Sequence, residues 1–319
     1  MIPSVNLNAS GLACLQPLLD RADQLRIGLA RADNGTQILD CGVHCCGGLE
    51  AGRLLAEVCL AGLGQVEIVP GSRDIYAGPA VTIRTDQPLA ACLGAQYAGW
   101  QISGDSFFAM GSGPMRAAAG KEPLFDQIGL RETVDGAIGV LESAQLPPPS
   151  ICQQIATDCG VAADQLTLLV ARTASQAGSL QVVARSVETA LHKMHELRFD
   201  LNRIASGYGT APLPPVAAND LAGIGRTNDA VLYGAEVTLW VTGDDRSLTE
   251  LGPQIPSNSS TAYGQPFAVI FEQHNRDFYK IDPLLFSPAV VTLINLDSGN
   301  RFRFGETQPD VLCTSFHGP

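Results

Sequence analysis

Residues 171–198 have the sequence ARTASQAGSLQVVARSVETALHKMHELR. Apolar residues recur there at steps of three and four, which predicts one buried face of a long helix. These residues are Leu180, Val183, Val187, Leu191, Met194 and Leu197. The mostly apolar run 166–170 just before this stretch predicts a buried strand. A strand, a polar turn and a long helix in this order indicate α/β construction.

A second set of side chains lies on roughly the opposite side of this helix. Arg185, Glu188, His192 and His195 follow at steps of three, four and three, so they stack in one stripe. A guanidinium beside a carboxylate keeps that carboxylate ionised, and a positioned carboxylate can take a proton from water. The alternative is a solvated helix face with an ordinary ion pair, worth only about 0.3–0.5 kcal/mol. The pattern alone favours this second interpretation.

Short strands and helices alternate along the rest of the chain, without an internal repeat. This order predicts an α/β fold with two side-by-side domains. The run Leu-Pro-Pro-Pro at 146–149 is the clearest change in composition. It divides the chain into an N-terminal α/β domain, 1–146, and a C-terminal α/β domain, 150–319. Discontinuous domains remain an open alternative.

Glycine marks the segments that follow the central helix. Ser-Gly-Tyr-Gly at 206–209 is expected to form a flexible turn. Residues 231–233 and 236–241 are expected to form paired strands around Gly234.

Composition restricts the function classes. The 319 residues are 45% hydrophobic and only 16% charged, with a formal net charge of −12. This acidity argues against nucleic-acid binding, which normally needs a basic patch, and against an anionic membrane surface. No apolar stretch approaches the roughly 18–20 residues of a membrane span, and the amino terminus does not resemble a signal peptide. Nine cysteines without regular spacing suggest reduced thiols, so we expect a cytoplasmic protein.

Three turns are candidates for ligand binding. Gly-Ser-Gly-Pro-Met-Arg at 111–116 is either an anion-binding corner with Arg116 nearby or a plain strand-to-helix turn. Thr173 and Ser175 are expected to cap the central helix, although the same N–H groups could face a ligand. The third turn contains four residues that could bind a metal, but they lie too close together in the sequence for a structural zinc site. These are Cys41, His44, Cys45 and Cys46, and we predict no metal there.

The stretch 181–197 and several further segments match, in order, the motifs of one enzyme family. These segments are 40–43, 47–52, 86–88, 96–100, 109–114, 141–143, 206–212, 225–230 and 278–283. On these residues the chain resembles the methenyltetrahydromethanopterin cyclohydrolase family. The main departure is the turn His44-Cys45-Cys46, because the family more often has fewer cysteines at this point.

The resemblance implies an enzyme with two α/β domains and a large substrate pocket between them, typically a cytoplasmic homotrimer. It implies reversible hydrolysis of N5,N10-methenyl-tetrahydromethanopterin to N5-formyl-tetrahydromethanopterin in one-carbon metabolism, without metal or organic cofactor. Arg185 and Glu188 match the family's catalytic Arg-x-x-Glu pair. The hypothesis is that Glu188 acts as general base and proton shuttle, while Arg185 orients it.

Contacts with the pterin substrate are expected from nine further residues. They are Ser112, Gly113, Arg116, Thr173, Ser175, Gln176, Arg226, Thr227 and Asn228. Each has an alternative role as a helix cap or turn residue.

Two other functions compete with the cyclohydrolase. The first is a metal-dependent amidohydrolase using His192, His195, Glu188 and Glu196, but His-x-x-His-Glu lacks a separated third ligand and matches no zincin helix. The second is a pterin-binding subunit without catalysis, against which both Arg185 and Glu188 are present. Tetrahydromethanopterin and its dephospho form differ far from the reacting carbon, so the sequence leaves both open as substrates.

Overall fold

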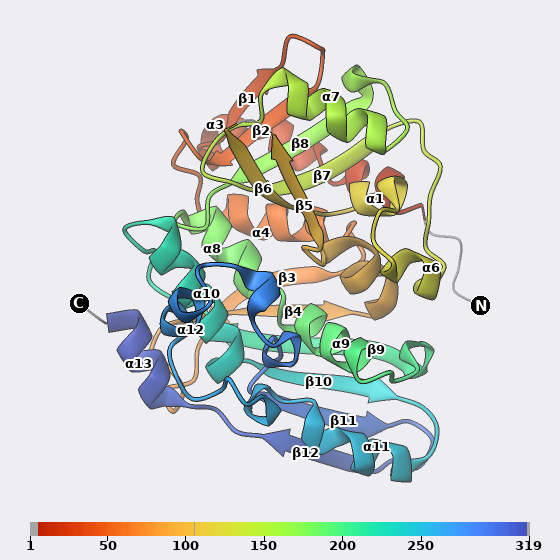
Figure 1. Cartoon of the computed structure of the whole chain (residues 1–319), viewed down its shortest axis with the longest axis vertical. Helices are drawn as coiled ribbons and strands as arrows, with labels where there is room; N and C mark the ends of the chain where they lie inside the picture. The colour runs from red at the N-terminus through yellow and green to blue at the C-terminus, as the bar shows by residue number, and fades with distance from the viewer. Residues whose placement is uncertain (1–5, 105, 318–319) are drawn as a thin grey trace. The chain divides into compact units, whose positions relative to one another are not determined.

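The computed structural model describes residues 6–104 and 106–317, which fold into two compact units (Figure 1). Unit 1 contains the chain up to Gln65 together with Ala90–Gln181, and unit 2 contains Val66–Leu89 together with the chain from Val182 onward. Each unit is built on one six-stranded sheet. The predicted α/β fold class is confirmed, whereas the pocket that the family resemblance implies stays a prediction.

Unit 1 has the strand order β1-β2-β8-β7-β6-β5. The strands are β1 (Gly28–Arg31), β2 (Gln37–Gly42), β5 (Trp100–Gly104), β6 (Phe107–Ser112), β7 (Ala137–Glu142) and β8 (Leu166–Ala171). Strands β2, β8 and β7 are parallel. Strand β1 is antiparallel to β2, β6 to β7, and β5 to β6. The helices are α1 (Leu7–Ala13), α2 (Gln16–Asp20), α3 (Ala22–Leu25), α4 (Leu49–Cys59), the π-helix η1 (Leu89–Gln96), α5 (Met115–Ala119), α6 (Leu124–Ile128), α7 (Pro149–Asp158) and α8 (Gln176–Val183).

The parallel strands of unit 1 are buried on both faces. Val140 belongs to a core cluster with Leu55 of α4, and the next residue, Leu141, belongs to a cluster with Ile155 of α7. Consecutive side chains of a strand point to opposite faces, so α4 and α7 cover opposite sides of the sheet. This explains why β8 is buried throughout and was predictable from its mostly apolar sequence.

Unit 2 has the strand order β12-β11-β10-β9-β4-β3. The strands are β3 (Gln65–Pro70), β4 (Pro79–Thr85), β9 (Ile204–Pro212), β10 (Glu236–Val241), β11 (Val290–Asn295) and β12 (Arg301–Gly305). Only the β10–β11 pair is parallel among the pairings described. The helices are α9 (Ser186–Glu196), α10 (Asp220–Gly234), α11 (Asp245–Leu251), α12 (Phe267–Gln273) and α13 (Pro309–His317), with 3₁₀ turns that include η5 (Ser257–Ser259) and η7 (Pro283–Leu285). No helix in the described part of the chain is long and apolar enough to cross a membrane.

The two units are interleaved along the chain, in contrast to a single division at 146–150. Val66–Leu89 belongs to unit 2 because β4 pairs with β9 from Ala80 opposite Pro212 to Thr85 opposite Gly207. The proline-rich run begins α7 of unit 1 instead of linking two domains, since proline is well suited to the first turn of a helix. Pairing between strands distant in sequence leaves no local signal, which explains the difference.

The central helix is not continuous. It divides into α8 and α9, and Arg185 lies at the junction with φ −90° and ψ 10°. The predicted apolar face is still buried on both parts, since Leu180, Val187 and Met194 have no exposed surface. The prediction of one long helix is therefore wrong at the junction alone, where regular periodicity hides a break of two residues between Val183 and Ser186.

The turn predicted at 206–209 is wrong, because these residues lie inside β9. A Cβ atom on Gly207 would lie 2.7 Å from Val187 Cγ1, and one on Gly209 would lie 2.4 Å from Ser186 Oγ. The glycines therefore let the first turn of α9 pack directly onto the strand. This contact fixes where Arg185 and Glu188 begin the helix.

The strand predicted at 231–233 is also wrong, because it forms the end of α10. Glycines made this helix difficult to recognise, since glycine is unfavourable in a helix interior. Here close packing requires two of them: a Cβ on Gly225 would lie 3.0 Å from that of Ala268, and one on Gly234 would lie 2.6 Å from Pro212 Cγ.

Candidate active site

Arg185 and Glu188 are buried at the start of α9. Their exposed fractions are 7% and 3%, which contradicts the interpretation of this stripe as a solvated face. Glu188 lies in the first turn of the helix, where the helix dipole favours a negative charge. Burial also excludes bulk water, which strengthens electrostatic interactions between the two groups. The start of α9 therefore holds a buried guanidinium and a buried carboxylate within one helical turn.

The two histidines of the stripe have different surroundings. His192 is half-buried, and its Nε2 lies 3.7 Å from Glu196 Oε1 one turn further on. His195 is also half-buried, at the last turn of α9. Among residues 6–104 and 106–317, no group of three or more His, Cys, Asp or Glu side chains has an arrangement that could hold a metal ion.

The cysteine-rich turn at the end of β2 is held by the side chain of Asp40, a residue of that strand. The carboxylate of Asp40 accepts hydrogen bonds from four backbone N–H groups, at 2.7–3.1 Å. The donors are Gly42, Val43, His44 and Cys45. These N–H groups are satisfied within the turn, so the turn offers them to no external anion.

The carboxyl ends of β2, β8 and β7 lie at one edge of the sheet in unit 1, as the ends of parallel strands must. Ligands in α/β sheets commonly bind at such an edge. Thr173 follows β8, and its hydroxyl donates a hydrogen bond to Glu142 Oε1 at the end of β7. Thr173 is only 3% exposed, and its carbonyl accepts a hydrogen bond from Ser179 Oγ at 2.9 Å. This hydrogen bond joins the segment 141–143 to the central stretch 171–198, through two residues that lie 31 positions apart in the sequence.

Ser175 and Gln176 follow Thr173 in the chain, and both form hydrogen bonds within the protein. Ser175 Oγ donates to the carbonyl of Arg172 at 2.8 Å and accepts from the N–H of Gly178 at 3.0 Å, which is a helix cap. Gln176 Oε1 accepts from Arg26 Nη2 at 3.3 Å on the surface. The capping alternative therefore describes Ser175, while substrate contact stays a prediction for both residues.

The turn 111–116 is occupied by internal contacts. Gly113 has φ +87°, which favours glycine, and its N–H donates to the carbonyl of Ala95 at 2.9 Å. Ser112 is 1% exposed. The side chain of Arg116 is fully buried: it donates to both carboxylate oxygens of Glu122, at 2.8 and 2.6 Å, and to two main-chain carbonyls, those of Leu93 and Ala95. This arrangement favours the plain-turn alternative for Arg116 over contact with a substrate anion.

Arg226, Thr227 and Asn228 lie on α10, where three consecutive residues point in different directions. Thr227 is 1% exposed and donates to the carbonyl of Gly223 at 2.9 Å. Asn228 donates to the carbonyl of Ile224 at 2.9 Å, and Arg226 donates to that of Pro215 at 3.2 Å. These contacts are local to unit 2, and they do not bring the three side chains together into one cluster.

Comparison with known proteins places the chain in a family. A family model described as "Cyclohydrolase (MCH)" matches residues 4–316. A protein of Rhodopirellula baltica named methenyltetrahydromethanopterin cyclohydrolase is 49% identical over 98% of this chain and 95% of its own length. Proteins of the same name from Methylobacillus flagellatus and Methanospirillum hungatei are 43% and 42% identical, each over 98% of this chain and 95% and 99% of their own lengths. The chain belongs to the methenyltetrahydromethanopterin cyclohydrolase family.

Within this cyclohydrolase fold, two buried ionisable residues of unit 2 were missed by sequence reasoning. Lys193 of α9 is fully buried and donates to Ser259 Oγ at 3.0 Å and to the carbonyl of Leu284. Burial lowers the pKa of Lys193 to about 8, against the attraction of Asp282. These bonds fasten η5 and η7 to the helix that carries Glu188.

The second missed residue, Asp229, follows the predicted Arg226–Asn228 run. It is fully buried, and its Oδ1 accepts the N–H of Phe267 at the start of α12 at 2.7 Å. Burial raises the pKa of Asp229 to about 7. Its position on the apolar side of an amphipathic helix could have identified Asp229 as buried. The glycines of α10 concealed that helix in the sequence.

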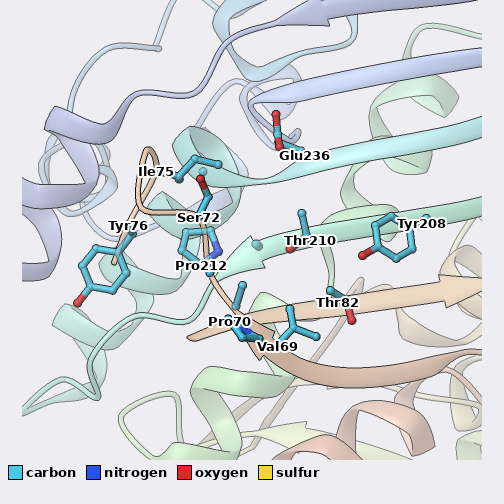
Figure 2. A pocket seen from close by; sticks show the side chains of 14 residues that line it. Val69, Pro70, Ser72, Ile75, Tyr76, Thr82, Tyr208, Thr210, Pro212 and Glu236 are labelled. Carbon is cyan, nitrogen blue, oxygen red and sulfur yellow. The ribbon is translucent and has the colours of Figure 1, made fainter. Parts of the chain in front are cut away.

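A cavity of about 350 Å³ opens on the sheet of unit 2 (Figure 2). It is lined by the β3–β4 loop with Ser72 and Tyr76, and by strand residues that include Thr82, Tyr208 and Thr210. Tyr208 alternates along β9 with Gly207 and Gly209, which face α9. The cavity therefore lies on the sheet face opposite to α9, and the Arg185–Glu188 pair does not line it.

Proposed function

We propose that this enzyme catalyses the reversible hydrolysis of N5,N10-methenyl-tetrahydromethanopterin to N5-formyl-tetrahydromethanopterin. Membership of the cyclohydrolase family and the names of the relatives support this substrate. The observation that carries the mechanism is the buried pair Arg185 and Glu188, one helical turn apart at the start of α9.

The substrate is an activated electrophile. Its methenyl carbon belongs to an amidinium-like cation, so it needs an oriented water and a base. In the proposed mechanism Glu188 takes a proton as the water oxygen bonds to the methenyl carbon. Glu188 then gives that proton to N10 as the bond between this carbon and N10 breaks. The hydroxyl proton leaves as the carbonyl of the N5-formyl group forms, so hydrolysis releases one proton overall.

Arg185 is the positioning partner in this mechanism. Its permanent positive charge, one helical turn before Glu188, favours the ionised form of the carboxylate and restrains its direction. A positioned general base typically contributes about 10²–10⁴-fold to the rate.

We further propose that the reaction uses no metal or organic cofactor and that the chain works as a cytoplasmic homotrimer in one-carbon metabolism. The intrinsic reactivity of the methenyl carbon supports the first part, because no Lewis acid is required to activate it. The resemblance to the family supports the trimer. Nine free cysteines suit a reducing compartment.

The test is a spectrophotometric assay that follows loss of the methenyl chromophore, with tetrahydromethanopterin and dephospho forms of the substrate and with or without EDTA. The proposal expects activity that EDTA does not change. Absence of activity on both forms would favour a pterin-binding subunit without catalysis, and activity abolished by EDTA would favour a metal-dependent hydrolase. Light scattering of the purified chain tests the trimer.

A further inference from the structure

Residues 260–286 of unit 2 form a long loop whose two ends meet. Near the ends, Ser260 Oγ donates a hydrogen bond to Asp282 Oδ2 at 2.6 Å. Four aromatic rings of this loop pack on one another, with neighbouring centroids 4.5–6.2 Å apart, a typical spacing for aromatic pairs. The rings are those of Phe267, Phe271, Phe278 and Phe286. We call residues 260–286 the aromatic loop.

Two buried side chains of α10 hold the first half of the aromatic loop. Asp229 Oδ1 accepts the N–H of Phe267 at 2.7 Å. The Tyr233 hydroxyl donates to the carbonyl of Gln265 at 2.5 Å and accepts the N–H of Gly264 at 3.1 Å. Neither side chain of α10 has exposed surface. The aromatic loop is therefore fixed to a second helix of unit 2 as well as being packed on itself.

Lys193 joins α9 to both ends of this loop. Its ammonium donates to Ser259 Oγ, just before the loop, at 3.0 Å, and to the carbonyl of Leu284 near its end. Ser259 is itself held, because its hydroxyl lies 2.8 Å from the carbonyl of Pro256. The side chain of Lys193 is fully buried. One buried charge thus connects the helix of the catalytic pair with two segments that lie far away in the sequence.

The two sides of α9 are restrained by different kinds of contact. On the side of the sheet, its first turn packs closely against Gly207 and Gly209 of β9. Packing of this kind sets the distance between helix and strand but has little directional preference. Hydrogen bonds are directional. Lys193 follows Glu188 by five residues, about 7.5 Å along the axis, so its bonds restrain the rotation of the helix at that point.

The charge of Lys193 is set by burial and by the aromatic loop. Burial lowers the pKa of Lys193 to about 8, and the negative charge of Asp282 opposes this shift. On the other elements packed against α9, Glu236 and Tyr208 line the cavity on the opposite face of the sheet, and Arg203 of η3 (Leu201–Arg203) donates to the Thr242 carbonyl at 2.7 Å. The remaining titratable groups of α9 itself are Glu188, His192, His195 and Glu196.

We propose that Lys193 is a positioning residue for the hydrolytic step, because its charged hydrogen bonds fix α9 against the aromatic loop and so fix the direction of Glu188. Hydrogen bonds from a charged donor are shorter and stronger than those from a neutral one. Lys193 acts through the helix and not on the substrate, since its side chain is fully buried and these bonds end on the protein. The assignment rests on the proposed function for the reaction that Glu188 serves.

The first test separates kcat from KM in the full-length protein. Lys193→Met keeps the length of the side chain and removes its donors. We expect kcat to fall by about 10- to 100-fold, because a small misplacement of the base affects the chemical step. KM should change by about twofold or less, since the lost interaction is not one with bound substrate. Lys193→Arg restores a charged donor and should recover most of the lost kcat.

The pH profile of kcat gives a second measurement, which a merely structural bond would not change. After subtraction of the uncatalysed rate, wild-type kcat should fall as pH rises through about 8, where Lys193 loses its charge. Asp282→Asn removes the carboxylate that favours this charge, so the fall should move to lower pH. Glu272→Gln is the matched control, since it removes a carboxylate of the same loop from an exposed ion pair with Arg276. It should leave kcat and the pH profile unchanged.

The outcomes separate this role from the proposed function. Wild-type kcat in a folded Lys193→Met variant would overturn the positioning role, whether or not the melting temperature falls. If that variant does not fold, Asp282→Asn decides, and a pH profile identical to that of wild type would overturn the role. Absence of hydrolysis by the wild-type enzyme would instead overturn the proposed function itself.

Discussion

Two buried arginines of this protein follow turns in the sequence and have different surroundings in the structure. Arg116 follows a glycine-rich turn in unit 1, and Arg185 follows the polar turn and first helix of the central stretch. Arg116 is committed to Glu122, two carbonyls and the rings of Tyr97 and Phe125, at 5.0 and 5.1 Å. Arg185 lies instead at a helix junction beside a buried acid in the first turn. An arginine near a turn is thus a poor indicator of a ligand site until its partners are known.

The largest effect on stability is expected for Arg116→Met. Removing one partner of a buried pair leaves the other uncompensated, which typically costs about 3–5 kcal/mol. Urea unfolding should show this loss, while KM of the folded fraction stays unchanged. Arg53→Met is the matched control: Arg53 pairs with Glu50 and Glu57 on the surface of α4, and its loss should cost about 1 kcal/mol or less. A raised KM in Arg116→Met would restore it as a substrate contact.

A smaller effect is expected for Gly209→Ala. The added methyl group would lie 2.4 Å from Ser186 Oγ and force the start of α9 away from β9. Overpacking of this kind typically costs about 1–3 kcal/mol. We also expect a loss of kcat, because Arg185 and Glu188 move with the helix. Gly136→Ala, whose Cβ would meet its nearest atoms at 3.4 Å, is the control that should keep kcat. Equal kcat in both variants would show that packing of α9 against β9 does not position Arg185 and Glu188.

The next prediction concerns Asp229 and the pH dependence of stability. The pKa of the buried carboxyl is raised from 3.8 to about 7, so the folded state binds a proton that the unfolded state has released. The stabilisation is present below pH 3.8 and is lost as pH rises through about 7, by at most about 1.4 kcal/mol per pH unit. Asp229→Asn should reduce this slope in melting temperatures measured from pH 4 to 7. An identical slope in wild type and variant would show that Asp229 titrates normally.

Sequence reasoning worked where structure is local. The buried strand predicted at 166–170 is confirmed as β8, because a mostly apolar run identifies a strand covered on both faces. The apolar face of the central stretch was also predicted, and its burial is confirmed on both α8 and α9.

The misses share a physical cause. In β9 and α10, glycines that are needed for close packing resemble turn signals, since only the partner that approaches them shows their purpose. Lys193 was likewise missed because its acceptors, Ser259 and Leu284, lie far away in the sequence. The spacing of Arg185 and Glu188 placed them on one stripe, but that pattern alone favoured a solvated face. The resemblance to the family selected the pair, and its roles stay predictions.

The account depends most on Glu188, and the most direct test is single-turnover hydrolysis of the methenyl substrate by Glu188→Gln. Glutamine keeps the size of the side chain but cannot accept the water proton. We predict that the rate falls by about 10²–10⁴-fold while the melting temperature stays close to that of wild type. Arg185→Met should also lose turnover, in contrast to Arg116→Met. Wild-type-like turnover in a folded Glu188→Gln variant would contradict the assignment of the base.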